Sequence, residues 1–189
     1  MRSSLDKFEK LVEALQKLPT IGKKSATRLA YHMVIKDSFT GIKISHAIEE
    51  ALGSLKQCSL CGGMSEDDLC YICCDENRDE TLLCIVENAK DILLLEENSL
   101  FEGRYFVLDS LEDLNFSSLQ KIVGSGVKEI VFALTPSIAN DAVMLYIEDK
   151  LSNFDINYSK IAQGVPTGVS LENIDLLSLT RALTDRVKV

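Results

Sequence analysis

The chain has 189 residues, of which 46% are hydrophobic and 26% are charged, and its formal net charge is -9 at pH 7. These proportions are ordinary for a folded protein and exclude a disordered chain. No apolar run approaches the length of a membrane span, and the first residues contain no apolar signal region. We therefore expect a cytoplasmic protein without a membrane partner, folded as one core with a smaller unit or as two small domains.

Charge is distributed unevenly along the chain. Residues 1–36 carry eight Lys or Arg against three Asp or Glu, whereas the remaining residues carry twelve bases against twenty-six acids. A basic N-terminal unit attached to an acidic body suggests nucleic acid at one end and protein partners elsewhere. Charge alone leaves a second interpretation open, in which the basic residues form a solvated helix face without a ligand.

Two helices are predicted near the N-terminus. Within residues 3–17, the apolar side chains fall on one stripe of an amphipathic helix: Leu5, Phe8, Leu11, Val12 and Leu15. This helix ends before Pro19, and Gly22 can take a tight turn, after which helical periodicity returns. The pattern predicts a helix, a short glycine hairpin and a second helix. Further apolar spacing over residues 42–55 predicts a third helix.

The start of the second helix is a candidate phosphate site. Its first backbone N–H groups have no partner within the helix and can receive a phosphate oxygen, while Lys23, Lys24 and Arg28 add positive charge. Such contacts recognise the DNA backbone and not the base sequence. Residues 18–30, Leu-Pro-Thr-Ile-Gly-Lys-Lys-Ser-Ala-Thr-Arg-Leu-Ala, resemble the helix-hairpin-helix DNA-binding motif. A purely structural helical hairpin would use the same proline and glycine, so that alternative stays open.

Two Cys-x-x-Cys knuckles, Cys58 with Cys61 and Cys70 with Cys73, are separated by eight residues. Each knuckle can offer two thiolates to one metal ion, and the intervening Gly62-Gly63 allows the second pair to fold back onto the first. Four sulfurs then surround one tetrahedral site without an open position, which predicts a structural Zn²⁺. We expect the segments on either side to depend on the metal.

The remaining cysteines leave two questions at the knuckle. Cys74 follows Cys73 directly and could replace it as the fourth ligand, although the paired spacing favours Cys73. Cys84 lies in an apolar run, where it is best interpreted as a small buried hydrophobic residue of a strand. A disulfide is disfavoured because adjacent knuckles without a secretion signal are typical of metal sites.

After the cysteines, apolar strands alternate with helices. Strands are predicted over residues 81–86, 104–108, 129–134 and 158–162, and helices over residues 89–97, 117–123 and 138–151. This alternation predicts an α/β fold with a parallel sheet covered on both faces. Any site would lie in the loops at the carboxyl ends of the strands.

The C-terminal part begins with a loop rich in glycine and proline at residues 163–168, followed by a helix predicted over residues 175–186. The loop does not fit a phosphate-binding P-loop, because no Gly-Lys-Ser or Gly-Lys-Thr follows and Pro166 lacks an amide donor. We expect residues 163–189 to form a subunit contact.

The chain resembles the RecR family of bacterial recombination mediators in the order of its motifs. These are the hairpin, the four-cysteine knuckle, an α/β unit that opens on Cys84-Ile-Val-Glu87, and the ending from Lys160 to Gly168. The resemblance spans nearly the whole chain. It implies four parts, which are a helix-hairpin-helix unit at 1–56, a four-cysteine zinc finger at 57–79, a Toprim-like α/β domain at 80–162, and a C-terminal loop and helix at 163–189.

The resemblance also implies a function. Members of the family bind single- and double-stranded DNA, including gapped DNA, without sequence specificity. They act with RecO and RecF to help load RecA on gapped DNA coated with single-strand-binding protein. They are not known as enzymes, and they assemble into homo-dimers or ring-like tetramers.

Carried over to this sequence, the resemblance assigns DNA binding to Lys24 and Arg28, with Lys23 in place of a more usual proline. It assigns zinc to the four knuckle cysteines, and a partner contact to Glu87, the acidic residue that ends the first Toprim strand. Some residues depart from the family: Lys160 replaces an Arg, and Val169, Ser170 and Asn173 interrupt the usual ending. These departures leave the subunit and partner contacts there open.

Two other functions compete with the mediator. A catalytic Toprim nuclease or topoisomerase needs Mg²⁺ held by the first-strand Glu and an Asp-x-Asp pair after a later strand, and residues 134–141, Leu-Thr-Pro-Ser-Ile-Ala-Asn-Asp, lack that pair. We therefore predict no catalysis, although weak Mg²⁺ binding near Glu87 and Asp91 stays open. The third candidate is a zinc-stabilised protein adaptor without direct DNA contact.

Overall fold

The structure is a computed structural model that describes residues 5–108, 115–162 and 168–174, together with positions 176, 178, 180 and 182. The chain divides into two compact units, Met1–Leu55 and Lys56–Val189, and each is described by itself. The predicted helix over residues 175–186 falls mostly outside the described residues. No helix in the described part of the chain is both long and apolar enough to cross a bilayer.

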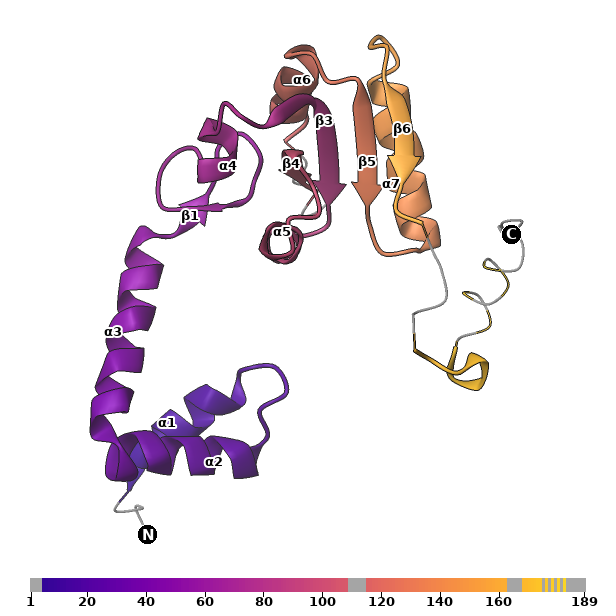
Figure 1. The fold of residues 1–189 in the computed structure, drawn as a ribbon. Helices are drawn as coiled ribbons and strands as arrows, with labels where there is room; N and C mark the ends of the chain where they lie inside the picture. The colour runs from indigo at the N-terminus through magenta and orange to yellow at the C-terminus, as the bar shows by residue number, and fades with distance from the viewer. Residues whose placement is uncertain are drawn as a thin grey trace. The chain divides into compact units, whose positions relative to one another are not determined.

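All elements of secondary structure in the described part of the first unit, residues 5–55, are helices (Figure 1). Its elements are α1 (Asp6–Gln16), α2 (Lys23–Tyr31), the π-helix η1 (His32–Lys36) and α3 (Ser38–Ser54). A small core joins α1 to α2: Val12, Ala26 and Ala30 are buried, and Phe8, Leu11, Leu15 and Ile21 pack against them. Four of the five residues of the predicted amphipathic stripe therefore lie on the buried side of α1, where burial of apolar surface holds the two helices together, whereas Leu5 precedes the helix and is 60% exposed.

The π-helix η1 continues directly from α2, and α3 begins one residue after it. Asp37 caps α3, because its Oδ1 accepts a hydrogen bond from the Thr40 N–H at 3.0 Å. Close packing of the two helices requires Gly41, since a Cβ there would lie 2.5 Å from the carbonyl oxygen of Met33. None of the residues of α3 is buried.

The second unit combines a small knuckle with an α/β unit. The knuckle holds β1 (Lys56–Gln57), β2 (Met64–Ser65) and α4 (Tyr71–Cys74). The α/β unit follows in the order β3 (Asp79–Val86), α5 (Ala89–Glu97), β4 (Gly103–Val107), α6 (Phe116–Gly124), β5 (Glu129–Ala133), α7 (Ile138–Lys150) and β6 (Asn157–Lys160), and a 3-10 turn, η2 (Leu171–Asn173), lies beyond it. The four long strands form one parallel sheet in the order β4-β3-β5-β6.

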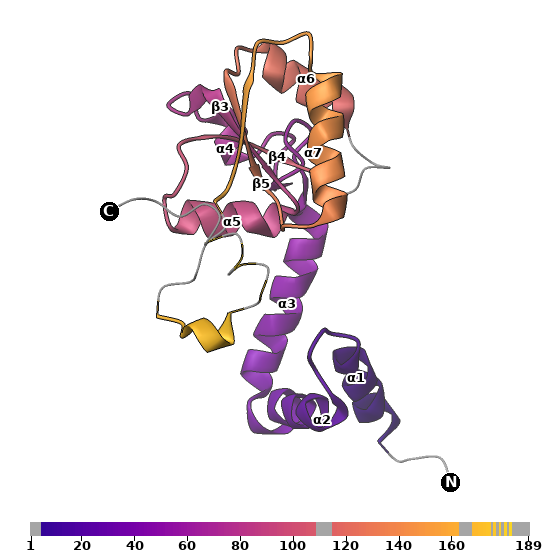
Figure 2. The ribbon, with the colours of Figure 1, turned by 90° about the vertical axis from the view of Figure 1, so that its right-hand side faces the viewer.

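The sheet is covered on both faces, as the strand and helix alternation predicted (Figure 2). On one face, α6 and α7 pack over a core whose buried members include Leu83, Ile85, Phe106, Leu119, Ile130, Phe132, Val143 and Ile147. On the other face, α5 and the knuckle share a core with alternate residues of the same strands: Cys84, Val86, Tyr105 and Val107. Because successive side chains of a strand point to opposite faces, the buried second half of β3 is apolar at every position, whereas β6, with the sequence Asn-Tyr-Ser-Lys, has no buried residue.

Candidate functional site

The hairpin between α1 and α2 forms the N-terminus of α2. Thr20 takes the left-handed conformation, with a φ of 66°, and Gly22 is the extended N-cap of α2, with φ -82° and ψ 169°. The expectation that Gly22 makes the tight turn is therefore wrong. At an N-cap without a side-chain oxygen, glycine leaves the first N–H groups of the helix open to an outside acceptor.

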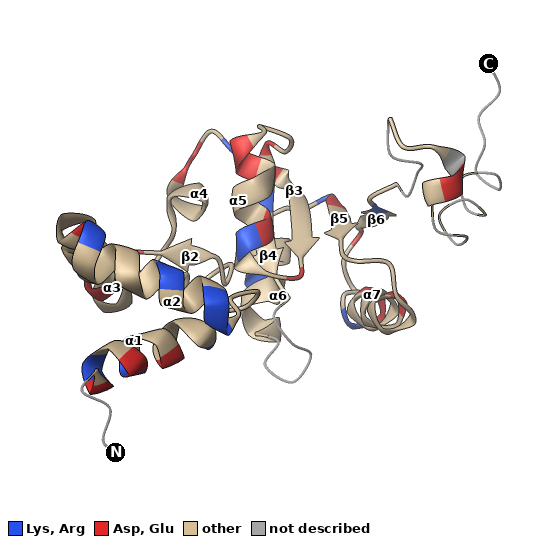
Figure 3. Ribbon diagram, turned by 90° about the horizontal axis from the view of Figure 1, so that it is seen from below, with Lys and Arg blue, Asp and Glu red and all other residues tan. Residues whose placement is uncertain are grey.

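The first turn of α2 presents both backbone donors and positive charge. The hydrogen bond from the Ala26 N–H to the Gly22 carbonyl oxygen, at 2.9 Å, begins the helix, and no side chain caps the three N–H groups before it. Lys23, Lys24 and Arg28 are exposed, whereas Ala26 and Ala30 hold the opposite side of α2 against α1. Figure 3 shows basic residues along α2. Lys23 and Lys24 thus lie in the first turn of α2, where an anion can bind, whereas Arg28 lies in the last turn of the same helix.

The four knuckle cysteines converge on one point. Their sulfurs all lie within 4.8 Å of one another. The Cys58 and Cys73 sulfurs are 3.8 Å apart, and the Cys61 and Cys70 sulfurs are 3.6 Å apart. Four sulfurs at ~2.3 Å from a tetrahedral zinc ion would be about 3.8 Å from one another, so the cluster has the size of a four-cysteine zinc site.

The local backbone explains why the four sulfurs meet. The Cys58 N–H donates to the Gly63 carbonyl oxygen at 2.7 Å, and Gly62 takes a left-handed φ of 75°, so the turn depends on that glycine as expected. Backbone N–H groups also face the sulfurs: Gly63 donates to the Cys61 Sγ and Cys70 to the Cys58 Sγ, both at 3.3 Å. These donors stabilise thiolate charge, as they do around metal-bound sulfur.

Hydrogen bonds among the four sulfurs shift the pKa values of the cysteine thiols, and so determine which protons a metal ion would displace. The hydrogen bond with Cys70 raises the pKa of Cys61 to about 12, and the hydrogen bond with Cys61 raises the pKa of Cys73. The hydrogen bond with Cys61 lowers the pKa of Cys70 to about 2. Cys61 and Cys73 thus keep their protons at neutral pH while Cys70 is ionised, and a Zn²⁺ ion that binds the cluster displaces the remaining protons. The four-cysteine set fits a structural zinc, whose role is to hold the fold.

The two other cysteines lie apart from the cluster. Cys74 is exposed and its sulfur is outside the group, so the structure places Cys73 in the fourth position. Cys84 is buried in β3, where burial raises the pKa of its thiol to about 12. All six cysteines lie among the described residues, and none is in a disulfide.

Glu87 lies directly after β3, at the carboxyl edge of the sheet. Its carboxylate accepts hydrogen bonds from the Thr135 N–H at 2.8 Å and the Thr135 hydroxyl at 2.9 Å, and also from the Asn140 side-chain amide. Partial burial opposes ionisation, but the Thr135 and Asn140 donors outweigh it and lower the pKa of Glu87. Thr135 and Asn140 are separated from Glu87 by some fifty residues of chain, and sequence reasoning did not find them.

The surroundings of Glu87 supply donors and not further metal ligands. Thr135, Pro136 and Ser137 follow β5, where a catalytic relative would carry its carboxylate pair. Asp91 is occupied in the capping box of α5, in which its Oδ2 accepts from the Asn88 N–H at 3.0 Å. Among the described residues, no group of three carboxylates or imidazoles gathers there.

The residues that depart from the family resemblance lie beyond this edge. The Lys160 Nζ is 3.7 Å from Asp141 Oδ1, so Lys160 still supplies a cation there. Val169, Ser170 and Asn173 are exposed, in and just before the short turn η2.

The fold and the two sites define a zinc-containing helix-hairpin-helix protein, a class that associates with DNA.

Comparison with known proteins assigns the family. The helix-hairpin-helix model of RecR matches residues 8–52, and the model of the RecR four-cysteine zinc finger domain matches residues 55–75. The recombination protein RecR of a Nitratiruptor species is 54% identical over 190 residues and covers 100% of both chains. That of Campylobacter jejuni is 49% identical over 190 residues, again over 100% of both chains, and that of Helicobacter pylori strain Shi470 is 48% identical over 188 residues, 99% of this chain and 97% of its own. The chain belongs to the RecR family, which gives it a role in DNA recombination and repair.

Proposed function

We propose that the chain is a non-catalytic mediator of recombinational repair that binds DNA without sequence specificity through Lys23, Lys24 and Arg28. The observation that carries the proposal is the uncapped, basic N-terminus of α2. Backbone N–H groups and lysine ammonium groups both bind phosphate oxygens, which every DNA sequence presents. Lys23 and Lys24 at this helix end, with Arg28 further along α2, therefore favour single-stranded, double-stranded and gapped DNA alike.

The proposed partners are RecO and RecF, with which the protein would help load RecA on gapped DNA coated with single-strand-binding protein. The family supports this role, and Glu87 at the carboxyl edge of the sheet is the proposed contact. Glu87 is half-buried and held by Thr135 and Asn140, so it presents a fixed negative charge to a basic partner.

The absence of catalysis in this proposal is supported by the chemistry around Glu87. Metal-assisted phosphoryl transfer requires several carboxylates around one ion. The hydrogen-bond donors of Thr135 and Asn140 occupy both carboxylate oxygens of Glu87 and cannot themselves bind a cation in that orientation. A mediator needs no such ion at this edge.

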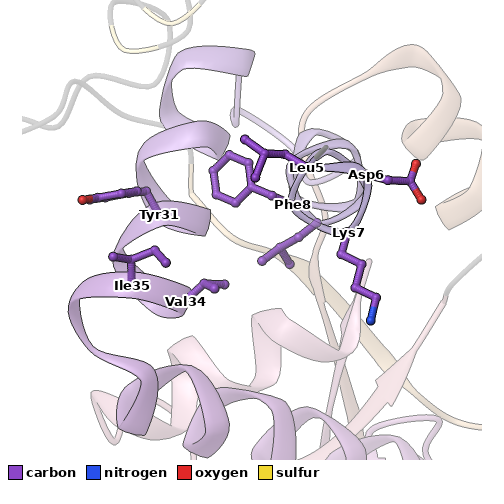
Figure 4. A pocket seen from close by; sticks show the side chains of 8 residues that line it. Leu5, Asp6, Lys7, Phe8, Tyr31, Val34 and Ile35 are labelled. Atoms are coloured by element: carbon purple, nitrogen blue, oxygen red, sulfur yellow. The ribbon is translucent and has the colours of Figure 1, made fainter. Parts of the chain in front are cut away.

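Self-assembly into a homo-dimer or ring-like tetramer is the second part of the proposal. A cavity of about 700 Å³ lies between α1 and the α2–η1 segment and is lined mainly by apolar side chains: Leu5, Phe8, Leu11, Tyr31, Val34 and Ile35 (Figure 4). On α3, Ile44, Ile48 and Leu52 are four residues apart and 41%, 54% and 80% exposed. Apolar surface on this scale is typical of an interface, and a second copy of the chain is the proposed occupant. Assembly would also gather several basic hairpins on one DNA and raise their effective concentration.

The test is fluorescence anisotropy of a labelled gapped duplex over a series of salt concentrations, at matched oligomeric state. Each lost phosphate contact should lower the slope of log affinity against log salt by about 1, so Lys24→Ala/Arg28→Ala should lower it by about 2 per bound subunit. The control Lys10→Ala/Lys43→Ala removes the same charge from the same unit outside the hairpin and should change the slope little.

Equal slopes for the hairpin variant and the parent protein would place the DNA contact elsewhere. If neither protein binds the duplex, a zinc-stabilised adaptor without direct DNA contact becomes the better account. A similar loss in both variants would mean that overall charge, and not the helix end, governs binding.

A further inference from the structure

Arg78 joins the end of the zinc knuckle to the end of helix α5. Its Nη1 donates to Glu96 Oε1 at 2.8 Å, and its Nη2 pairs with Glu96 Oε2, so the two planar groups meet through two parallel bonds. The same Nη1 lies 3.2 Å from the Phe101 carbonyl oxygen, in the loop after α5. On the knuckle side, the Arg78 Nε lies 3.7 Å from Asp75 Oδ2.

The pair is partly shielded from solvent. The side chain of Arg78 is 14% exposed and that of Glu96 is 16% exposed. Glu96 Oε1 also accepts a hydrogen bond from the Tyr105 hydroxyl at 2.8 Å, and Tyr105 is almost completely buried in β4. Removing one partner of this partly shielded pair is unfavourable, because the other charge loses its bidentate partner in a position with restricted access to water.

Only a few residues of chain separate the zinc ligand Cys73 from Arg78. Cys73, a zinc ligand, lies in the single turn of α4, and Asp75 is the C-cap of that turn. Asp75 Oδ1 accepts a hydrogen bond from the Asn77 N–H at 2.9 Å, which fixes the loop that carries Arg78. Movement of Cys73 on metal release therefore moves the group that holds the Arg78 guanidinium.

A second connection runs through the core. Ile92 of α5 is buried with the ligands Cys58, Cys61 and Cys70 in one apolar cluster. A Cβ on Gly63 would lie 3.2 Å from the Cys61 Sγ and 3.3 Å from the Ile92 Cδ1, which shows how closely the metal-binding loop packs on α5. The zinc site thus touches the middle of α5 through packing and its end through Arg78.

We propose that Arg78 and Glu96 are positioning residues that couple the zinc site to helix α5, so that bound zinc holds α5 in place and α5 in turn slows release of the metal. Two sites linked in this way affect each other by the same free energy in both directions. The N-terminus of α5 is the capping box of Asn88 and Asp91, next to Glu87. The coupling therefore reaches the residue for which we propose a partner contact, although its test depends on neither partner nor DNA.

The chain offers a matched control for a purely structural ion pair. Arg104 of β4 pairs with Glu80 of β3, and the Arg104 side chain is 15% exposed, close to the value for Arg78, although Glu80 is 53% exposed where Glu96 is 16% exposed. That pair joins two strands of the sheet, and its hydrogen bond and ion pair involve no residue of the knuckle or of α5. Arg104→Gln therefore removes an arginine–carboxylate pair without the proposed connection.

The experiment uses the zinc-loaded full chain and two readouts. The first is the rate of zinc release to an excess of a chromogenic chelator. The second is hydrogen exchange, by mass spectrometry, of peptides covering α5, with zinc bound and after chelation. We expect Arg78→Gln and Glu96→Gln each to speed zinc release about tenfold, within the usual range of coupling between sites. The double variant should release zinc no faster than either single variant, because both remove one interaction.

Hydrogen exchange should show the other direction of the coupling. In the parent protein, chelation should raise the exchange rate of α5 about tenfold. In Arg78→Gln, α5 should already exchange faster with zinc bound, and chelation should add less. Arg104→Gln should keep both readouts within about twofold of the parent protein.

Three results would overturn the proposal. These are zinc release from Arg78→Gln within twofold of the parent rate, an α5 exchange rate that does not respond to chelation in the parent, and equal effects of Arg78→Gln and Arg104→Gln. If Arg78→Gln does not fold, Arg78→Lys keeps the charge but loses the paired geometry. Its zinc release should then be faster than that of the parent, and an unchanged rate would equally refute the coupling.

Discussion

Replacing Glu87 with glutamine tests whether its carboxylate fixes the loop after β5. In the parent protein, both carboxylate oxygens accept hydrogen bonds, from the Thr135 N–H at 2.8 Å, from the Thr135 hydroxyl at 2.9 Å and from the Asn140 amide. A glutamine side chain exchanges one acceptor for a donor, which then faces another donor. Hydrogen bonds to a charged group contribute more than neutral ones, and Glu87 is half-buried, so we expect Glu87→Gln to lower the free energy of unfolding by about 1 to 2 kcal/mol at pH 7.

The measurement is urea unfolding of zinc-loaded protein, followed by circular dichroism. Glu97→Gln is the matched control, because it removes the same charge from an exposed position on α5 and should change the free energy of unfolding by less than about 0.5 kcal/mol. Equal stability of Glu87→Gln and the parent at pH 7 would refute the assigned hydrogen bonds. It would also leave Glu87 free to act only as a partner contact.

The pH dependence gives the same prediction a second test. Burial opposes ionisation of Glu87, but the Thr135 and Asn140 donors outweigh it and place its pKa below the ordinary value of 4.5. A carboxylate with a lowered pKa contributes stability above the unfolded value, and that contribution is lost as the pH falls through the folded value. The difference between the parent and Glu87→Gln should therefore shrink below pH 4.5. A difference that stays constant from pH 7 to pH 3 would contradict this reasoning.

Other perturbations test the remaining parts of the structure. Cys70→Ser should lower zinc affinity by at least about 100-fold, since four ligands share about 10 kcal/mol or more, and a parental zinc content after dialysis would contradict the site. Zinc affinity should fall about tenfold or more per pH unit on acidification, because Cys61, with a pKa of about 12, must lose its proton to bind; calorimetric titrations that show no pH dependence would oppose this. Ala26→Leu overfills a fully buried position and should cost the first unit about 1 to 3 kcal/mol in thermal unfolding, with zinc retained. Leu52→Lys should shift the protein to smaller species in analytical ultracentrifugation, unless α3 lies outside the subunit contact.

The parts of the fold that sequence could predict are those whose causes are local. The four zinc ligands lie within one short segment, and their spacing alone brings two pairs of sulfurs together. Helix α5 has the predicted bounds 89–97, because Asn88 and Asp91 form its capping box within three residues. The strand β3 was visible as an apolar run since both of its faces are buried.

The parts that escaped prediction depend on contacts across the chain. The hydrogen bonds from Thr135 and Asn140 to Glu87 and the pairing of Arg78 with Glu96 join residues that no spacing rule connects. The conformation of the turn between α1 and α2 was also predicted wrongly, although Thr20 and Gly22 are only two residues apart. A glycine is the usual choice for a left-handed turn, yet Thr20 takes it here. Helix α3 was predicted to begin at residue 42, but it begins at Ser38. Asp37 is a residue type that commonly caps helices, and its position marks this start.

Along the chain, the four zinc ligands come before most of the apolar residues that pack over them in the folded protein. The last ligand is Cys73, whereas the buried cover on the sheet and α5 comes from residues between Cys84 and Val107. A ribosome releases the chain from its N-terminus, so the four thiols emerge before the strands that will enclose them. The growing chain can therefore take up its metal from solution while the site is open, and the metal becomes shielded from competing cellular thiols only once β4 has been made.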